Sequence, residues 1–234
     1  MNNKAGFMGG LYAISELIMK FSLINLFWIL FNIPLVFLVL NLLFIEQKDE
    51  LPFFLIPLII LMPIIFFPAT TAMFGMVRGW IIKDEDSSHL FKSYWRYYKE
   101  NYKRSASSGL ILTIAWMIWA VDVYYFFNKN SMMMFLFMIM GIGLFVFSIN
   151  HFSVTVHYHM KLFTALKNTL LLTIGSPVLF IAVAISSGVV LYVSLNIFRF
   201  FLIFLTGSLI AFLSFSAFYR SYLKITDKSK ILND

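Results

Sequence analysis

The residues that could do chemistry in this chain are polar side chains set inside long apolar stretches. A polar atom in hydrocarbon is costly unless it is paired, so its depth in a membrane points to function. Counted at about 1.5 Å per residue along each predicted span, seven such residues fall in the inner half of the bilayer. They are Asn25, Thr70, Thr71, Asn150, His151, Thr173 and Ser176.

These amides, hydroxyls and the imidazole could hydrogen-bond a small polar solute in a cavity that opens to the cytoplasm. Pro34, Pro68 and Pro177 lie in three of the same spans, and a proline frees a backbone carbonyl, as in the broken helices of transporters. The alternative is that each residue bonds to a neighbouring helix, which is the commoner role of Asn, Ser and Thr in membranes. The sequence leaves both interpretations open.

Two charged residues form a second candidate site near the opposite membrane face. Asp122 lies five residues from the outer end of its predicted span, and Arg199 lies two residues into another. We expect an ion pair, because a lone carboxylate in lipid would take up a proton or be reached by water. Its expected role is to lock two helices together rather than to relay protons.

The chain carries no recognisable catalytic set. It has no Cys, no Walker loop and no Gly-x-Ser-x-Gly elbow. His157 and His159 are two residues apart, so on a helix their rings would point about 200° apart, which is poor for sharing one metal ion. We therefore expect no enzymatic activity, no cofactor and no metal.

Composition identifies the solvent in which these residues must be positioned. Of the 234 residues, 61% are hydrophobic and only 12% are charged, which is too little polar surface for a water-soluble domain. Uncharged runs long enough to cross about 30 Å of hydrocarbon predict six helices. The predicted spans are 21–44, 53–77, 107–127, 132–155, 168–193 and 197–219. The expected fold is all-α, a polytopic membrane helical bundle that forms a single integral membrane domain over residues 1–234.

The positions of Lys and Arg predict the orientation of this bundle. Fifteen of the 18 fall in segments on one side of the predicted membrane, against Lys48, Lys129 and Arg199 on the other. This bias places both termini in the cytoplasm, with an interfacial segment at 1–20 and a cytoplasmic tail at 220–234. The net charge of +7 then reflects membrane topology, and we expect no nucleic-acid partner.

Residues 84–104 form the one clearly amphipathic stretch, in which an aromatic and a basic stripe recur at helical spacing. The aromatic residues are Phe91, Tyr94, Trp95, Tyr98 and Tyr102, and the basic residues are Lys92, Arg96, Lys99 and Lys103. We expect a helix in the headgroup plane, with its aromatic face among acyl chains and its cations toward anionic lipid. The same surface could dock a protein partner instead, and the sequence does not separate the two.

Three motifs resemble the YesL family of bacterial integral membrane proteins. They are Asn25-Leu-Phe-Trp-Ile-Leu-Phe-Asn-Ile-Pro34, then Pro68-Ala-Thr-Thr-Ala-Met-Phe74 with Arg78 and Trp80, then Phe91 to Trp95 with Lys99-Glu-Asn101. This family is a domain of unknown function that is often encoded beside carbohydrate uptake genes in Gram-positive bacteria. The resemblance covers the amino-terminal half of the chain.

The resemblance implies a location in the bacterial plasma membrane and an accessory or regulatory role in carbohydrate uptake, with permease subunits of a sugar transporter as partners. Two alternatives come from the residues themselves. One is a small-molecule carrier or channel built around the seven inner polar residues. The other is lipid sensing through the amphipathic helix at 84–104.

Overall fold

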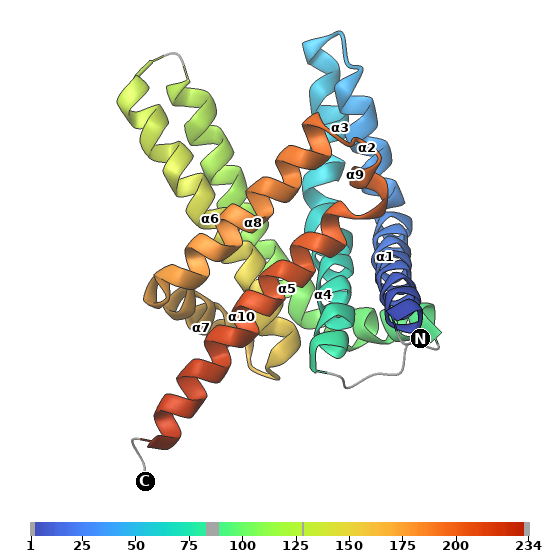
Figure 1. Ribbon diagram of the computed structural model, residues 1–234. Helices are drawn as coiled ribbons and strands as arrows, with labels where there is room; N and C mark the ends of the chain where they lie inside the picture. The colour runs from blue at the N-terminus through green and yellow to red at the C-terminus, as the bar shows by residue number, and fades with distance from the viewer. Residues whose placement is uncertain (1–2, 83–88, 128, 232–234) are drawn as a thin grey trace.

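The protein is helical throughout the part that the structure, a computed structural model, describes: residues 3–82, 89–127 and 129–231 (Figure 1). The elements in chain order are α1 (Asn3–Phe31), α2 (Ile33–Leu43), η1 (Lys48–Glu50), α3 (Leu51–Leu61), η2 (Met62–Phe66), α4 (Phe67–Ile82), α5 (Leu90–Phe126), α6 (Ser131–His157), α7 (Leu162–Gly175), α8 (Pro177–Asn196), α9 (Phe201–Phe204) and α10 (Thr206–Ile231). The predicted all-α fold is confirmed.

Within these described ranges, five stretches are long and apolar enough to cross a membrane. They are Met8–Phe31, Leu51–Ile82, Leu90–Phe126, Ser131–His157 and Pro177–Asn196. The fold is therefore a polytopic helical bundle. The predicted span 132–155 agrees best with the structure, because α6 covers it with only a few extra residues. The predicted span 107–127 corresponds to the carboxyl-terminal part of α5.

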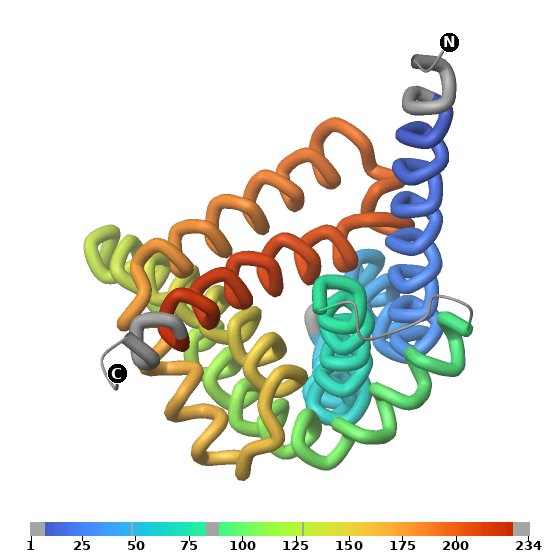
Figure 2. The backbone as a smooth tube through the Cα atoms, turned by 60° about the horizontal axis from the view of Figure 1, so that its bottom comes forward, coloured from blue at the N-terminus to red at the C-terminus, as the bar shows by residue number. Residues whose placement is uncertain are grey.

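The first predicted span, 21–44, is two helices rather than one. α1 passes without a break from the predicted interfacial segment 1–20 into that span, so residue 20 is not an element boundary. The helix stops at Asn32 instead, because Pro34 has no N–H to bond to the carbonyl of Leu30. α1 lies across the direction of α3 and α4, and its amino-terminal part projects beyond the other helices (Figure 2).

The predicted spans 168–193 and 197–219 are also divided. The first breaks between α7 and α8, because Pro177 cannot donate the N–H that would bond to the carbonyl of Thr173. The second is interrupted at Leu205, between the single turn of α9 and the start of α10. The sixth crossing predicted there is thus not one uninterrupted helix, and α10 is not among the five long apolar stretches.

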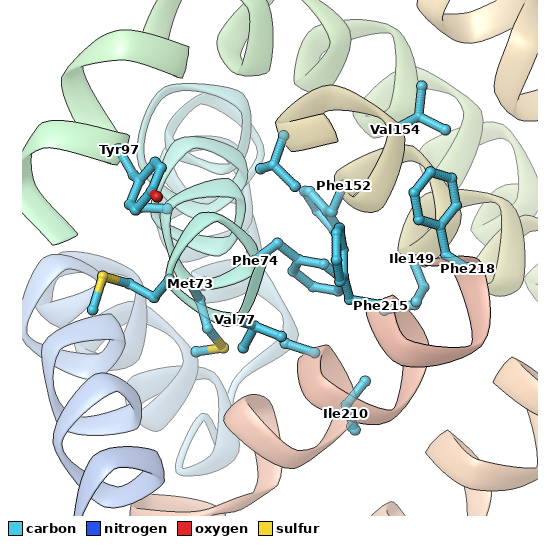
Figure 3. Close-up of a cluster of buried hydrophobic side chains, with 14 of the residues drawn as sticks. Met73, Phe74, Val77, Tyr97, Ile149, Phe152, Val154, Ile210, Phe215 and Phe218 are labelled. Atoms are coloured by element: carbon cyan, nitrogen blue, oxygen red, sulfur yellow. The ribbon is translucent and has the colours of Figure 1, made fainter. Parts of the chain in front are cut away.

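The helix α4 is the centre of the bundle and is buried along most of its length. Figure 3 shows Met73 and Phe74 of α4 among apolar side chains from α5, α6 and α10. Small residues on α4 let these neighbours approach closely, as is usual in membrane bundles. A Cβ at Gly75, for example, would lie only 2.7 Å from the ring of Tyr97.

The beginning of α4 packs equally closely against α5. A Cβ at Gly109 would lie 2.7 Å from Cγ of Phe67, so this contact requires glycine. Pro63 and Pro68 each remove a backbone donor in the same region, which accounts for the π-helical turn η2 just before α4. The close approach fixes the position of α4 against the crossing part of α5.

The predicted amphipathic segment 84–104 is the first part of α5 rather than a separate helix. Residues 84–88 lie outside the described residues, and the helix then continues from Leu90 to Phe126 without a break. Its first part lies at the lower right in Figure 1, near the start of α1, before the helix turns upward. At about 1.5 Å per residue this helix is about 55 Å long, enough for both a surface part and a crossing part.

The chain ends lie toward one side of the bundle. The start of α1, the end of α4, the α6–α7 connection and the end of α10 all lie in the lower part of Figure 1, whereas the α2–α3 and α5–α6 turns lie at the top. The predicted topology requires this arrangement. α10 extends through Ile231, so most of the predicted tail 220–234 is helical, and residues 232–234 lie outside the described residues.

Candidate functional site

Asn25 joins α1 to the junction of α9 and α10, and its side chain is fully buried. Its Nδ2 donates to the carbonyl of Ile203 at 2.6 Å and to that of Leu202 at 3.3 Å, while its Oδ1 accepts the backbone N–H of Ser208 at 3.2 Å. Backbone groups at helix ends lack partners within their own helix. Asn25 therefore satisfies groups that the break between α9 and α10 leaves open.

Thr70 and Thr71, on α4, bind α1 and α5. The indole N–H of Trp28 in α1 donates to the hydroxyl of Thr70 at 3.0 Å. The hydroxyl of Ser105 in α5 donates to that of Thr71 at 2.8 Å. Each threonine in turn donates to the backbone carbonyl four residues earlier, so this group fastens α4 to α1 and α5.

Asn150 and His151 bind α7. The Nδ2 of Asn150 donates to the hydroxyl of Thr173 at 3.0 Å. The ring of His151 lies between two hydroxyls, with Nδ1 3.2 Å from Thr169 and Nε2 3.3 Å from Thr155. The Oδ1 of Asn150 is buried and has no hydrogen-bond partner among the described residues.

Six of the seven predicted polar residues thus fall into three hydrogen-bonded groups rather than around one cavity. One group joins α1 to α9 and α10, a second joins α4 to α1 and α5, and a third joins α6 to α7. Ser176, the seventh residue, lies at the α7–α8 break, where its carbonyl accepts the N–H of Phe180 at 3.0 Å. Cross-helix hydrogen bonds of this kind contribute about 0.6 kcal/mol each, and the geometry favours the packing interpretation.

Asp122 and Arg199 do not pair in the structure. Asp122 is half-buried on the outer part of α5, whereas Arg199 is exposed between α8 and α9. Neither residue forms an ion pair with the other in the described part of the chain. The prediction rested on matching depth, but the outer end of α5 packs beside α6, far from the α8–α9 connection (Figure 1).

The basic stripe of α5 occupies the exposed face of its surface part. Lys92, Arg96, Lys99 and Lys103 are all exposed. Trp95 is 41% exposed, and the ammonium of Lys99 lies 4.7 Å from the centroid of its ring. The residues predicted to form a lipid or partner surface therefore share one outer face, which we call the basic face of α5.

The aromatic stripe of α5 faces α1 and α4 more than it faces lipid. Tyr94 is fully buried, and its hydroxyl donates to the carbonyl of Ala69 in α4 at 2.8 Å. The ring of Phe31 in α1 lies 5.1 Å from that of Tyr94, 5.6 Å from Trp95 and 4.9 Å from Tyr98. The prediction that this face lies among acyl chains is wrong for Tyr94, because α1 covers it.

Arg104 is a positioning residue that sequence reasoning treated only as a topological charge. Its guanidinium donates to the carbonyl of Tyr158 at 3.0 Å and to Oδ1 of Asn101 at 2.7 Å, and it lies 3.2 Å from Nδ1 of His159. These contacts fasten α5 to the α6–α7 connection. In that connection, burial raises the pKa of the Tyr158 phenol, and the neighbouring Tyr222 raises it further.

Four further side-chain hydrogen-bond partners were also missed: Trp28, Ser105, Thr155 and Thr169. Thr169 lies one helical turn before Thr173, a spacing that could have identified it. Trp28 and Ser105 lie on different helices from the threonines they bind. No spacing along the chain could have revealed those two.

His157 and His159, near the end of α6, have different neighbours. No group of three or more His, Cys, Asp or Glu side chains suited to a metal is found in the described part of the chain. The ring of His157 packs instead among aromatic side chains, 4.7 Å from that of Tyr158 and 4.5 Å from that of Tyr222.

Apolar crossing helices joined by buried hydrogen bonds define a polytopic helical membrane protein. Residues 21–123 match the family described as "Protein of unknown function, DUF624". This is the YesL-like family, so the resemblance seen in the amino-terminal half is confirmed.

The chain is also similar to the uncharacterized protein YteU of Bacillus subtilis (strain 168), with 26% identity over 173 residues. That match covers 73% of this chain and 66% of YteU, just under two thirds of the relative. No solved structure matches the chain.

Proposed function

We propose that this protein is an accessory or regulatory component of carbohydrate uptake in the bacterial plasma membrane, with both termini in the cytoplasm. The carbohydrate context comes from the resemblance to the YesL family, whose members are often encoded beside carbohydrate uptake genes. The proposed partners are permease subunits of a sugar transporter, together with membrane lipids. The proposal includes no enzymatic activity, no cofactor and no solute pathway of its own.

The observation that carries this proposal is the way in which the buried polar groups pair. A sugar carrier has to present several hydrogen-bonding groups to one cavity, because ligand specificity comes from convergent polar contacts. Here Asn25 binds three backbone groups, and the ring of His151 lies between two threonines. Engaging a solute would require these helix contacts to break, which supports a structural role for them.

The grooves on the described surface also favour a protein that does not itself bind sugar. Three of them have volumes of about 680, 510 and 500 Å³. Their linings are almost entirely apolar, with Thr173 and Thr113 among the few polar residues. A sugar in such a groove would lose its hydrogen bonds to water without replacing them.

The basic face of α5 is the surface that we propose for contact with a partner or with anionic headgroups. Its four cations are exposed on one side of a helix that runs along the edge of the bundle. Each Lys or Arg near an anionic membrane surface contributes about 1 kcal/mol of attraction, which salt weakens. An acidic loop of a permease would be attracted in the same way.

Two measurements on the intact chain test the proposal. A mild-detergent pull-down from the native membrane should recover sugar permease subunits, and their recovery should fall when the four cations of the basic face are replaced by Gln. The purified protein in liposomes should accumulate radiolabelled mono- and disaccharides no faster than empty liposomes. Sugar accumulation would assign the protein to the carriers, and a pull-down without permease subunits would reject the accessory role.

A further inference from the structure

A groove of about 680 Å³ lies between α6, α7 and α8. Its lining includes Phe147 of α6, Leu170 and Ile174 of α7, and Phe180 of α8, and almost all of it is apolar. Ile174 is 72% exposed at the edge of the groove. Because these helices belong to the membrane bundle, the molecules available to fill the groove from outside are mainly lipids.

A glycine makes room on the α6 side of this groove. Gly143 belongs to the lining, and a Cβ built at this position would meet no heavy atom within 4 Å. The glycines that the packing of the bundle requires behave differently, since a Cβ at Gly75 or Gly109 would clash with an aromatic ring. Gly143 therefore leaves open space that no side chain of the described protein fills.

A cation on α7 precedes the groove by one helical turn. Lys167, Leu170 and Ile174 are spaced three and four residues apart, so they share one face of the helix. Lys167 is exposed and forms no ion pair within the described part of the chain. It lies about 4.5 Å along the helix axis from Leu170, toward the α6–α7 connection.

The other two grooves do not combine an apolar lining with a nearby cation. One lies between α3 and α5 and the other between α5, α6 and α8, and no Lys or Arg lies within four residues of any residue that lines them. Both are formed near the outer parts of their helices, around Trp116 and Trp119. They serve as internal comparisons for a site in which an apolar groove adjoins a free cation.

We propose that the groove between α6, α7 and α8 binds one acyl chain of an anionic phospholipid, whose phosphate is bound by Lys167. The apolar lining and the space above Gly143 accept the chain, and the ammonium of Lys167 selects a negatively charged headgroup from the same leaflet. The charge of Lys167 is complementary to the phosphate of this phospholipid, and the apolar face of α7 is complementary to its acyl chain. The site is independent of any role in carbohydrate uptake.

Photolabelling tests the proposal on the full chain in lipid nanodiscs. The probes are phosphatidylglycerol and phosphatidylcholine that carry the same diazirine acyl chain, and the adducts are mapped by mass spectrometry of peptides. We expect phosphatidylglycerol to label Phe147, Leu170 or Phe180 several-fold more than phosphatidylcholine does. The grooves around Trp116 should show no such preference.

Two pairs of variants separate chain binding from headgroup binding. Gly143→Leu fills the groove and should reduce labelling by both lipids, whereas Gly188→Leu fills the groove between α5, α6 and α8 and should not. A Cβ at Gly188 also meets nothing within 4 Å, which makes it a matched control. Lys167→Gln should lower the preference for phosphatidylglycerol about fivefold, whereas Lys224→Gln, an equal charge loss on α10, should leave it unchanged.

The same measurements can overturn the proposal. Equal labelling of the three grooves, labelling that survives Gly143→Leu, or equal effects of Lys167→Gln and Lys224→Gln would each exclude a specific lipid site. A photoreactive side chain introduced at Leu170 should yield an adduct with the mass of one phospholipid. Crosslinking to a second protein chain instead would assign the groove to helix packing.

Discussion

The side-chain oxygen of Asn25 accepts the backbone N–H of Ser208 at 3.2 Å, although the two residues are 183 positions apart in the chain. The contact depends on glycine at position 207, because a Cβ there would lie 2.8 Å from the same oxygen. The first and last long helices are therefore fastened to each other at one buried amide.

Replacing Asn25 with Leu should lower the free energy of unfolding by about 1–2 kcal/mol, because three cross-helix hydrogen bonds are lost. The measurement is denaturant or thermal unfolding of the purified protein in a mild detergent. Asn41→Leu is the matched control, since among the described residues the Asn41 side-chain amide bonds only to the carbonyl of Phe37 in its own helix. Equal destabilisation by the two substitutions would contradict a special role for Asn25.

Replacing Gly109 with Ala should destabilise the protein by about 1–3 kcal/mol, because the added methyl group overlaps the ring of Phe67. Gly188→Ala should be neutral or stabilising, since a Cβ at that position meets nothing and alanine favours the helix. Phe67→Leu should recover part of the loss caused by Gly109→Ala. If the loss of stability in the double variant equals the sum of the losses in the two single variants, the added methyl group does not overlap the ring of Phe67.

His151 and Thr169 should be energetically coupled by about 0.6 kcal/mol, the usual value for a hydrogen bond between membrane helices. A double-mutant cycle with His151→Leu and Thr169→Val measures this coupling. His159→Leu combined with Thr169→Val should give a coupling near zero, because His159 is exposed in the α6–α7 connection. A His151→Leu variant with unchanged stability would instead favour a solute-binding role for this residue.

The absence of cysteine allows the membrane orientation to be measured on single-cysteine variants without background. Gln47→Cys, in the α2–α3 connection, should react with a membrane-impermeant maleimide added to intact cells. His159→Cys, in the α6–α7 connection, should react only after the membrane is made permeable. Both positions are exposed. The opposite pattern would invert the predicted topology, and reaction at both sites in intact cells would contradict it.

Hydropathy predicted the helices well where one crossing is one helix, as at α6. It did not predict where helices stop inside a span, as at Asn32 and Ser176. The reason is that the hydropathy of a long apolar run changes little when the run contains a proline. The sequence does contain Pro34 and Pro177, but proline also occurs in unbroken membrane helices. Whether it kinks or ends a helix depends on the neighbours that pack there.

The sequence did not show in which direction each polar side chain of the candidate site points around its helix. Asn150 and Thr173 were both expected in the inner half of the bilayer, and they are hydrogen-bonded at 3.0 Å. The cavity interpretation would have Asn25 converge with them, yet it faces α9 and α10. A membrane helix is apolar on most of its faces, so the periodicity that orients a helix in a soluble protein is missing.

The unbroken course of α5 from Leu90 to Phe126 links two places that are otherwise far apart. Its surface part and its crossing part share one series of backbone hydrogen bonds, and neither can roll or slide alone without breaking several of them. The basic face and the α5–α6 turn are therefore the two ends of one continuous helix that changes direction between them, so a molecule bound at the first end contacts the same helix that leads to the second.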